Sequence, residues 1–197
     1  MSRLAVVFPG IGYTADKPLL HYCRRLVAAL GYEIRIMNYK GFPSKVKGDR
    51  KRMEESFSIA LEQSLEMLSE ISLEAYEDIL FIGKSVGTIV AAKLASESPV
   101  KERIRLVLYT PLPETFSFSF GEAIVFTGTA DPWVGQDSSP IPGICKERGI
   151  PCTQINKGNH SLESEDILSD INELYRIMEE THLFVCLPVL SEIEKRG

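Results

Sequence analysis

A buried strand that runs directly into a glycine-flanked turn and then into a helix constrains this chain more than any other stretch. Residues 79–82 read Ile-Leu-Phe-Ile, an apolar run that is typical of a strand covered on both faces. Gly-Lys-Ser-Val-Gly follows at 83–87, and an alanine-rich helix is expected over 86–97. The tight backbone of such a turn leaves no room for side chains at the positions two residues before and two residues after the serine, so Gly83 and Gly87 are required there. The sequence therefore predicts that the Ser85 hydroxyl is held at the end of a strand.

Strands and helices alternate along the whole chain. Strands are expected at 3–8, 32–37, 78–82, 104–109, 123–127 and 152–155. A helix is expected to begin at Pro18 and to end before Gly31. This alternation predicts a single α/β domain over residues 1–197, a three-layer α/β/α sandwich whose mostly parallel sheet has about six strands.

Two further helices are expected from apolar stripes at helical spacing. One stripe contains Met53, Phe57, Ala60, Leu61, Leu65, Leu68 and Ser72. The stripe of the final helix contains Ile167, Leu168, Ile171, Leu174, Tyr175 and Met178.

Composition excludes some classes of function. The chain has 197 residues, of which 44% are hydrophobic, which is enough for one sizeable core. Its net charge of −5 argues against a nucleic-acid-binding surface. A basic run is the local exception; it contains Lys45, Lys47, Arg50, Lys51 and Arg52. It is interpreted as the solvated start of a helix or as a surface that attracts an anionic partner.

The cysteines and the apolar runs bear on location and partners. The four cysteines are scattered without a C-x-x-C pair, as in a cytoplasmic protein with reduced thiols. Apolar runs at 4–8 and 183–190 are too short for a signal peptide or a membrane span, so no membrane partner is expected. The second run is interpreted as a docked C-terminal segment or as the contact of a homodimer.

The serine turn has two matching loops further along the chain. Asp131 follows the fifth expected strand, within Thr-Gly-Thr-Ala-Asp-Pro-Trp at 127–133. His160 follows the sixth strand, within Gly-Asn-His-Ser-Leu-Glu at 158–163. The G-x-S-x-G motif after the third strand, with the order Ser85, Asp131 and His160, resembles the α/β-hydrolase superfamily. Because the connection 110–122 is too short for an inserted domain, the resemblance implies a minimal α/β-hydrolase fold without a cap domain.

The resemblance also implies a role for each residue. Ser85 would be the nucleophile, His160 the base that takes its proton, and Asp131 the carboxylate that orients the imidazole. The oxyanion hole would use the Val86 N–H and the Ile11 N–H. Ile11 lies in Phe-Pro-Gly-Ile-Gly-Tyr at 8–13, which resembles the family's His-Gly-x-Gly loop with proline in place of histidine.

The implied function is a small serine hydrolase that cleaves an ester, a thioester or a similar bond of a small-molecule acyl substrate through an acyl-enzyme. Residues flanking the catalytic loops are expected to bind this substrate; they are Gly12, Tyr13, Lys84, Trp133 and Leu162. Phe116, Phe118 and Phe120 are expected to line a cleft wall or to extend the sheet edge as a short strand.

Several alternatives remain open at this point. Glu114 and Asp137 are rival acids, Asp131 before a proline also suits a plain turn, and His160 also suits a helix cap. An inactive hydrolase-fold binding module is the other alternative, although the presence of all three residues of the triad favours catalysis.

Nucleotide, cofactor and metal binding have weaker support. Gly10-x-Gly12-x-x-Ala15 matches the dinucleotide fingerprint, but Met37 and Asn38 stand where that fingerprint expects an acid. Gly83-Lys84-Ser85 also matches the end of the phosphate-binding motif G-x-x-x-x-G-K-[ST]. That motif requires glycine at position 78, where this chain has aspartate, so a phosphate-binding loop is rejected. The three dispersed histidines form no recognisable ligand set, so neither a cofactor nor a metal is expected.

Overall fold

Six strands form one sheet in the computed structural model, which describes residues 2–135 and 138–196, with side chains as far as Cys186. The strands are β1 (Arg3–Phe8), β2 (Glu33–Ile36), β3 (Asp78–Lys84), β4 (Ile104–Tyr109), β5 (Ala123–Gly128) and β6 (Cys152–Ile155). Their order across the sheet is β2-β1-β3-β4-β5-β6, and every neighbouring pair is parallel. The predicted α/β fold is confirmed, and the sheet described here is entirely rather than mostly parallel. All carboxyl ends therefore meet at one edge.

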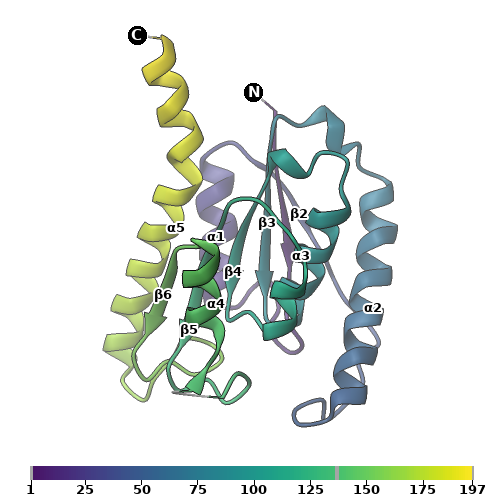
Figure 1. The fold of residues 1–197 in the computed structure, drawn as a ribbon, viewed down its shortest axis with the longest axis vertical. Coiled ribbons are helices and arrows are strands. Elements are labelled where there is room, and N and C mark those ends of the chain that lie inside the picture. Colours follow the sequence, from purple (N-terminus) through teal and green to yellow (C-terminus); the bar gives the residue numbers. More distant parts are fainter. Residues whose placement is uncertain (1, 136–137, 197) are drawn as a thin grey trace.

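Helices cover both faces of the sheet (Figure 1). The helices are α1 (Pro18–Ala29), α2 (Arg50–Ser69), α3 (Val86–Glu97), α4 (Ile141–Arg148) and α5 (Ile167–Arg196), with short 3₁₀ helices η1 (Leu73–Ala75), η2 (Lys101–Arg103) and η3 (Pro113–Ser117). Helices α1 and α5 pack on one face and α2, α3 and α4 on the other. Three layers result, as expected for parallel strands joined by crossover helices.

Strand residues divide between the two cores by their parity. On β3, Ile79 and Phe81 face the layer of α2 and α3, whereas Leu80 and Ile82 face the layer of α1 and α5. Both sets are fully buried, which explains why these strands read as continuous apolar runs. Because of this alternation, consecutive residues at the start of the serine turn point to opposite sides of the sheet.

A buried ion pair fixes the last helix to the sheet. Arg105 of β4 donates to the Asp78 carboxylate of β3 at 2.9 Å and to the Phe184 carbonyl of α5 at 2.8 Å. The Tyr32 hydroxyl also donates to Asp78. Because the charges of Arg105 and Asp78 are buried and hydrogen-bonded to each other, removal of either would leave an unpaired charge in the core.

The face that α5 turns to the core differs from its apolar stripe. Ile177, Thr181, Phe184 and Val185 are buried, whereas most of the predicted stripe is exposed, including Ile167 at 75%. At this buried face the Phe184 carbonyl accepts the hydrogen bond from Arg105. For the run 183–190, the burial of Phe184 and Val185 agrees with a docked segment, but the side chains from residue 187 lie outside the described part and the homodimer stays a prediction.

The packed face of α2 largely follows its predicted stripe, with two buried serines beside it. Met53, Phe57, Ala60, Leu61 and Leu68 pack in or against the core of this layer, whereas Leu65 is 51% exposed. Ser56 and Ser64 are also buried, although they lie outside the stripe. Ser64 satisfies its hydroxyl by donating to the Ala60 carbonyl at 2.7 Å and by pairing with the Tyr39 hydroxyl at 2.9 Å. Small residues with internal hydrogen bonds thus let α2 lie close to α3.

Two segments between strands differ from expectation. The connection 110–122 contains η3 and no short edge strand; of its phenylalanines, Phe116 is buried and Phe118 lines a cavity, as the alternative of a cleft wall expected. Helix α4 was not anticipated, because its short sequence contains Pro142 and Gly143 and has little apolar periodicity. Within the described residues, no helix is long and apolar enough to cross a membrane.

The glycines beside Ser85 are required by close backbone packing. A Cβ on Gly87 would lie 2.0 Å from the Phe8 carbonyl oxygen and 2.6 Å from the Pro9 carbonyl oxygen. A Cβ on Gly83 would lie 2.8 Å from the Thr88 Cα. The start of α3 therefore rests directly on the end of β1, and only glycine permits this contact.

We expect Gly87→Ala to lower the free energy of unfolding by about 3 kcal/mol or more, because the new methyl group meets backbone that cannot rotate away. Gly143→Ala in α4 is the matched control, since its Cβ would meet nothing within 4 Å. This control should change stability by less than about 1 kcal/mol. Urea unfolding of the two variants checks the prediction, and equal stabilities would contradict it.

Candidate active site

Ser85 occupies a strained turn between β3 and α3. Its φ of 55° and ψ of −125° are rare for a residue with a side chain and cost on the order of 1–3 kcal/mol. Thr88 holds the turn, because its N–H and its hydroxyl donate to the Ser85 carbonyl at 2.8 and 2.6 Å. The hydroxyl of Ser85 is thereby fixed at the carboxyl edge of the sheet.

His160 bridges Ser85 and Asp131. Its Nε2 lies 2.8 Å from Ser85 Oγ, and its Nδ1 lies 2.7 Å from Asp131 Oδ2. The other carboxylate oxygen of Asp131 accepts the Trp133 N–H at 2.9 Å, and Asp131 is completely buried. Because Nδ1 faces a carboxylate, it carries the proton, which leaves Nε2 free to accept the proton of the serine hydroxyl.

Two glycines bring the loops of Asp131 and His160 together. A Cβ on Gly128 would lie 2.0 Å from the Gly158 carbonyl oxygen, so the two backbones are in direct contact. The Ala130 N–H donates to this same carbonyl at 3.0 Å. Both loops were predicted from the sequence, but their contact was not. The glycine at the end of β5 and the glycine two positions before the histidine could have indicated it.

The environment of His160 favours its neutral form. Burial lowers the pKa of the imidazole below its ordinary value of 6.5. The hydrogen bond to Asp131 opposes this shift, and the positive charges of Lys84 and Lys47 add to it. A neutral imidazole at neutral pH is the form that can accept a proton.

Lys84 lies inside the protein rather than in a substrate cleft. It is 1% exposed, and its Nζ lies 4.8 Å from the centre of the Tyr13 ring. Burial lowers its pKa from 10.5 to about 7, against the opposing effect of Asp131 and Glu163. The burial of Lys84 therefore contradicts the expectation that its side chain contacts substrate. Like Leu80 and Ile82, Lys84 points to the α1 and α5 face of the sheet.

The other residues expected to bind substrate divide into two groups. Tyr13 is buried, and its hydroxyl accepts the Leu19 N–H at 3.1 Å, which makes it part of the core. Leu162 is also buried, but it lines a second cavity together with Leu19 and residues of α5. Gly12 is exposed in a turn, and Trp133 stacks on His160 with ring centres 5.2 Å apart.

The loop after β1 forms a tight turn against the serine. Gly10 and Tyr13 exchange two backbone hydrogen bonds of 3.2 and 3.3 Å, with Ile11 and Gly12 between them. A Cβ on Gly10 would lie 3.1 Å from the Ser85 Cβ. The turn is thus in place beside the Ser85 side chain, and the Val86 N–H lacks an intrahelical acceptor because Val86 is the first residue of α3.

This turn leaves little room for the dinucleotide alternative. Helix α1 begins only at Pro18, so its N-terminus does not lie on the glycines, and Gly10 is already packed against Ser85. Among the described residues, no group of three His, Cys, Asp or Glu side chains is placed to hold a metal ion. Of the rival acids, Glu114 lies on η3, and Asp137 falls outside the described residues.

Comparison with known proteins identifies the architecture. No protein-family profile matches the chain, and no curated protein matches its sequence. Solved structures do match. One is an α/β serine hydrolase homologue from Coxiella burnetii, which is 16% identical with a TM-score of 0.61; the match covers 93% of this chain and 83% of that chain. The chain has the α/β-hydrolase fold.

Two other α/β-hydrolase structures are similarly close. A lidless α/β serine hydrolase from Xanthomonas campestris is 14% identical with a TM-score of 0.63, and the match covers 94% of this chain and 84% of that one. Est1E from Butyrivibrio proteoclasticus, solved with ferulic acid, is 13% identical with a TM-score of 0.62 over 91% and 89% of the two chains. At these identities the likeness extends to the fold alone. In this chain the connection 110–122 contains only η3 and no inserted domain.

Replacement of Lys84 by methionine should stabilise this protein. Its side chain gives up a proton near pH 7 when folded but near pH 10.5 when unfolded, so the unfolded state binds more protons between these values. The stability of the wild type must therefore rise with pH across this window. Lys84→Met should remove that rise and add a few kcal/mol of stability at neutral pH. Urea unfolding from pH 6 to 10 checks this, and an unchanged pH dependence contradicts it.

Proposed function

We propose that this α/β-hydrolase is a serine hydrolase that cleaves an ester, thioester or similar acyl bond of a small molecule. The observation that carries the proposal is the chain of hydrogen bonds from Ser85 Oγ to His160 Nε2 and from His160 Nδ1 to Asp131 Oδ2, at 2.8 and 2.7 Å. A hydroxyl is a weak nucleophile unless a base takes its proton, and the chain places such a base in contact with Ser85. This geometry supports Ser85 as the nucleophile, His160 as the base and Asp131 as the carboxylate that orients it.

The reaction would take place in two steps. Ser85 Oγ attacks the acyl carbon while its proton passes to His160 Nε2, which then returns the proton to the departing alcohol or thiol. The product of this step is an ester between Ser85 and the acyl group. Water, deprotonated by the same imidazole, then attacks this ester and releases the acid and free Ser85.

Backbone N–H groups would stabilise the negative oxygen of each tetrahedral intermediate. The Val86 N–H, at the positive end of α3, is one proposed donor, and the Ile11 N–H in the turn beside Ser85 is the other. Gly12 is the neighbouring donor in the same turn. Loss of one such donor typically lowers turnover by about 10²–10³-fold.

A fluorophosphonate probe tests the nucleophile directly. We expect the probe to modify the wild type at Ser85, as seen by mass spectrometry of peptides, and to leave Ser85→Ala unmodified. Asp131→Asn should lower ester turnover by about 10⁴-fold, because the amide cannot hold the required tautomer of the imidazole. Absence of labelling over a range of pH would exclude a serine hydrolase and favour a binding module.

The pH dependence of ester hydrolysis tests the role of His160. Since burial and Lys84 lower the pKa of His160, kcat/KM should fall on the acid side with a midpoint below pH 6.5. Lys84→Met removes a positive charge that lowers this pKa, so its midpoint should move to higher pH. A midpoint that stays in place or moves lower would contradict the electrostatic link between Lys84 and the imidazole.

A further inference from the structure

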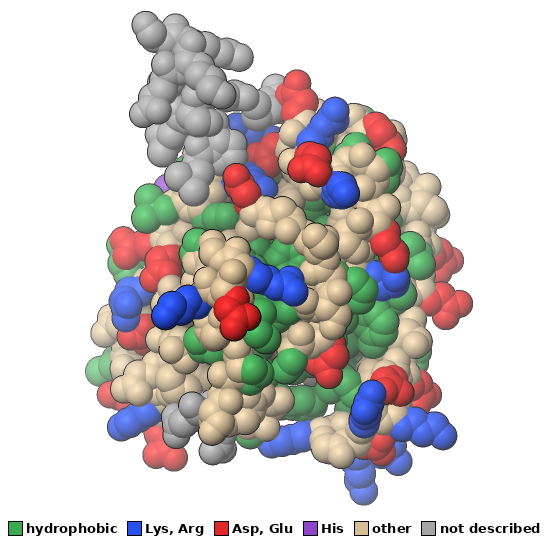
Figure 2. Space-filling view, viewed as in Figure 1, with side chains coloured by type: hydrophobic (Ala, Val, Ile, Leu, Met, Phe, Trp, Pro, Cys, Tyr) green, Lys and Arg blue, Asp and Glu red, His purple; other side chains and the backbone are tan. Residues whose placement is uncertain are grey.

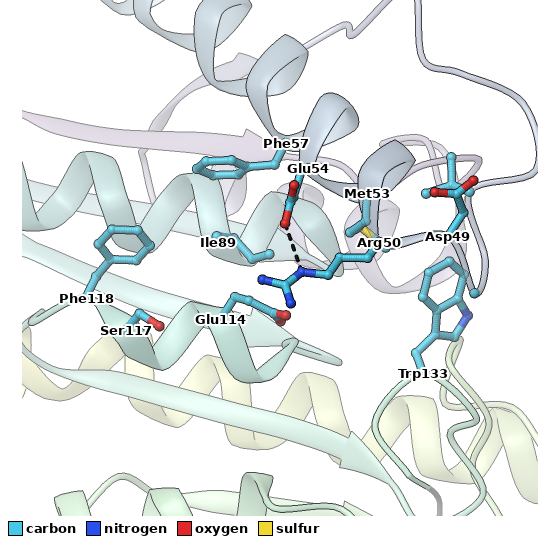
Figure 3. Close-up of a pocket in the computed structure, with 12 residues that line it drawn as sticks. Asp49, Arg50, Met53, Glu54, Phe57, Ile89, Glu114, Ser117, Phe118 and Trp133 are labelled. Atoms are coloured by element: carbon cyan, nitrogen blue, oxygen red, sulfur yellow. Dashed lines mark hydrogen bonds and ion pairs between the residues drawn. The ribbon is translucent and has the colours of Figure 1, made fainter.

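A cavity of about 460 Å³ lies beside the candidate active site, on the α2 and α3 side of the sheet. Its walls come from the start of α2, from η3, and from single residues of α3 and of the loop after β5 (Figure 3). The lining residues are Val46, Gly48, Asp49, Arg50, Met53, Glu54, Phe57, Ile89, Glu114, Ser117, Phe118 and Trp133. This volume is within the range of small-molecule pockets.

The interior of the cavity is apolar and its charged residues lie at the rim. Met53, Phe57, Ile89, Phe118 and Trp133 all pack against the hydrophobic core of this layer. Figure 2 shows hydrophobic side chains in the lower half of this face, with basic side chains beside them at the lower right. An apolar surface of this kind favours a hydrocarbon group that leaves water.

The rim charges are largely occupied by one another. The Arg50 side chain is 93% exposed and pairs with Glu54 at 2.9 Å. Asp49 accepts the Arg52 N–H at 3.0 Å as the N-cap of α2. Among the described residues that line the cavity, Arg50 is the single cation and is paired with Glu54, whereas Asp49, Glu54 and Glu114 are acids, so an uncharged ligand fits better than a carboxylate.

One aromatic ring joins this cavity to the candidate triad. The Trp133 indole lines the cavity and stacks on the His160 imidazole, with the ring planes 26° apart. His160 in turn contacts Ser85 Oγ at 2.8 Å. Ile89 also lines the cavity and lies about one helical turn after Ser85 along α3. A group bound in the cavity is therefore within reach of a bond held at Ser85.

We propose that this cavity binds an uncharged hydrocarbon arm of the substrate, an alkyl chain or an aryl ring, while the adjoining acyl bond lies at Ser85. The inference rests on the proposed hydrolase function and names the class of its substrates. Each methylene that enters the cavity should raise kcat/KM by about fourfold. The arm is attached either to the acyl carbon or to the leaving oxygen, and the experiment distinguishes the two.

The fluorescence of Trp133 measures occupancy without catalysis, because it is the single tryptophan of the chain. Ser85→Ala protein is titrated with methyl octanoate. We expect a saturable shift of the emission to shorter wavelength as water leaves the indole. An unchanged emission at all concentrations would overturn the proposal.

A matched pair of variants on one segment tests the location. Ser117 is exposed and lines the cavity, whereas Ser119, two positions later, does not. Ser117→Phe should weaken methyl octanoate binding at least tenfold, and Ser119→Phe should bind as the parent does. Met53→Phe narrows the cavity from α2 and provides a second variant in case Ser117→Phe does not fold.

Hydrolysis of three esters then assigns the arm. In the Ser85 protein, Ser117→Phe should slow methyl octanoate or octyl acetate at least tenfold and leave methyl acetate within twofold. Slowing of the octanoate alone places the acyl chain in the cavity, and slowing of the octyl ester alone places the alcohol there. If Ser117→Phe and Met53→Phe both leave the long esters unaffected, the cavity is not the binding site.

Failure of the hydrolase function gives a different result. If no ester is cleaved but Trp133 emission still responds and Ser117→Phe weakens that response, the cavity proposal stands and the hydrolase proposal falls. If methyl acetate is cleaved through Ser85 while Trp133 never responds, the hydrolase proposal stands and the cavity proposal falls.

Discussion

The contact between the start of α3 and the end of β1 is the constraint on which the rest of this structure depends. With the Gly87 Cα so near the Phe8 carbonyl, the helix begins immediately above the sheet edge, and Ser85 must take a left-handed φ to connect strand and helix. The same closeness places the turn of Gly10 against the serine side chain. The proposed nucleophile and the proposed oxyanion donors are thus positioned by backbone packing, which is more rigid than side-chain packing.

The two sides of the sheet contribute different surroundings to the candidate site: a buried positive charge on one side and an apolar cavity on the other. Toward α1 and α5, Lys84 is buried under Tyr13 and adds a positive potential near His160. Toward α2 and α3, the site borders an apolar cavity through Trp133. The cost of burying Lys84 is an example of stability given up near a functional group, which natural proteins commonly show at such positions.

Sequence patterns predicted strand positions and the meeting of Ser85, Asp131 and His160 well, because each rests on local signals: apolar runs and glycine turns at strand ends. Helix faces were less predictable. On α2, Ser64 is buried because its hydroxyl is satisfied within the helix, so the contact face includes a polar residue that a hydrophobic stripe leaves out. On α5, the buried face includes Ile177, Thr181, Phe184 and Val185, whereas most of the predicted stripe is exposed.

The other incorrect expectation concerned the direction in which the Lys84 side chain points rather than the position of the residue. Lys84 was expected at the substrate because it neighbours the serine, yet strand parity with Leu80 and Ile82 directs it inward. That parity was legible in the sequence. The cavity was predicted only in part: Phe118 and Trp133 were expected at a cleft or pocket and do line it. The wall from α2 was not expected, because α2 and η3 are far apart in the chain and meet only through tertiary packing.

The Asp131 carboxylate and the Trp133 indole belong to one turn, in which the Trp133 N–H holds the carboxylate while its ring forms the cavity wall. Mutations that reshape this wall by altering the turn would also disturb the group that orients His160. Evolution of a new ligand preference is thereby directed to α2 and η3, whose side chains can change in size without reaching the proton relay. The loop of the acid is the conservative part of the pocket, and the helices opposite are the part free to diversify.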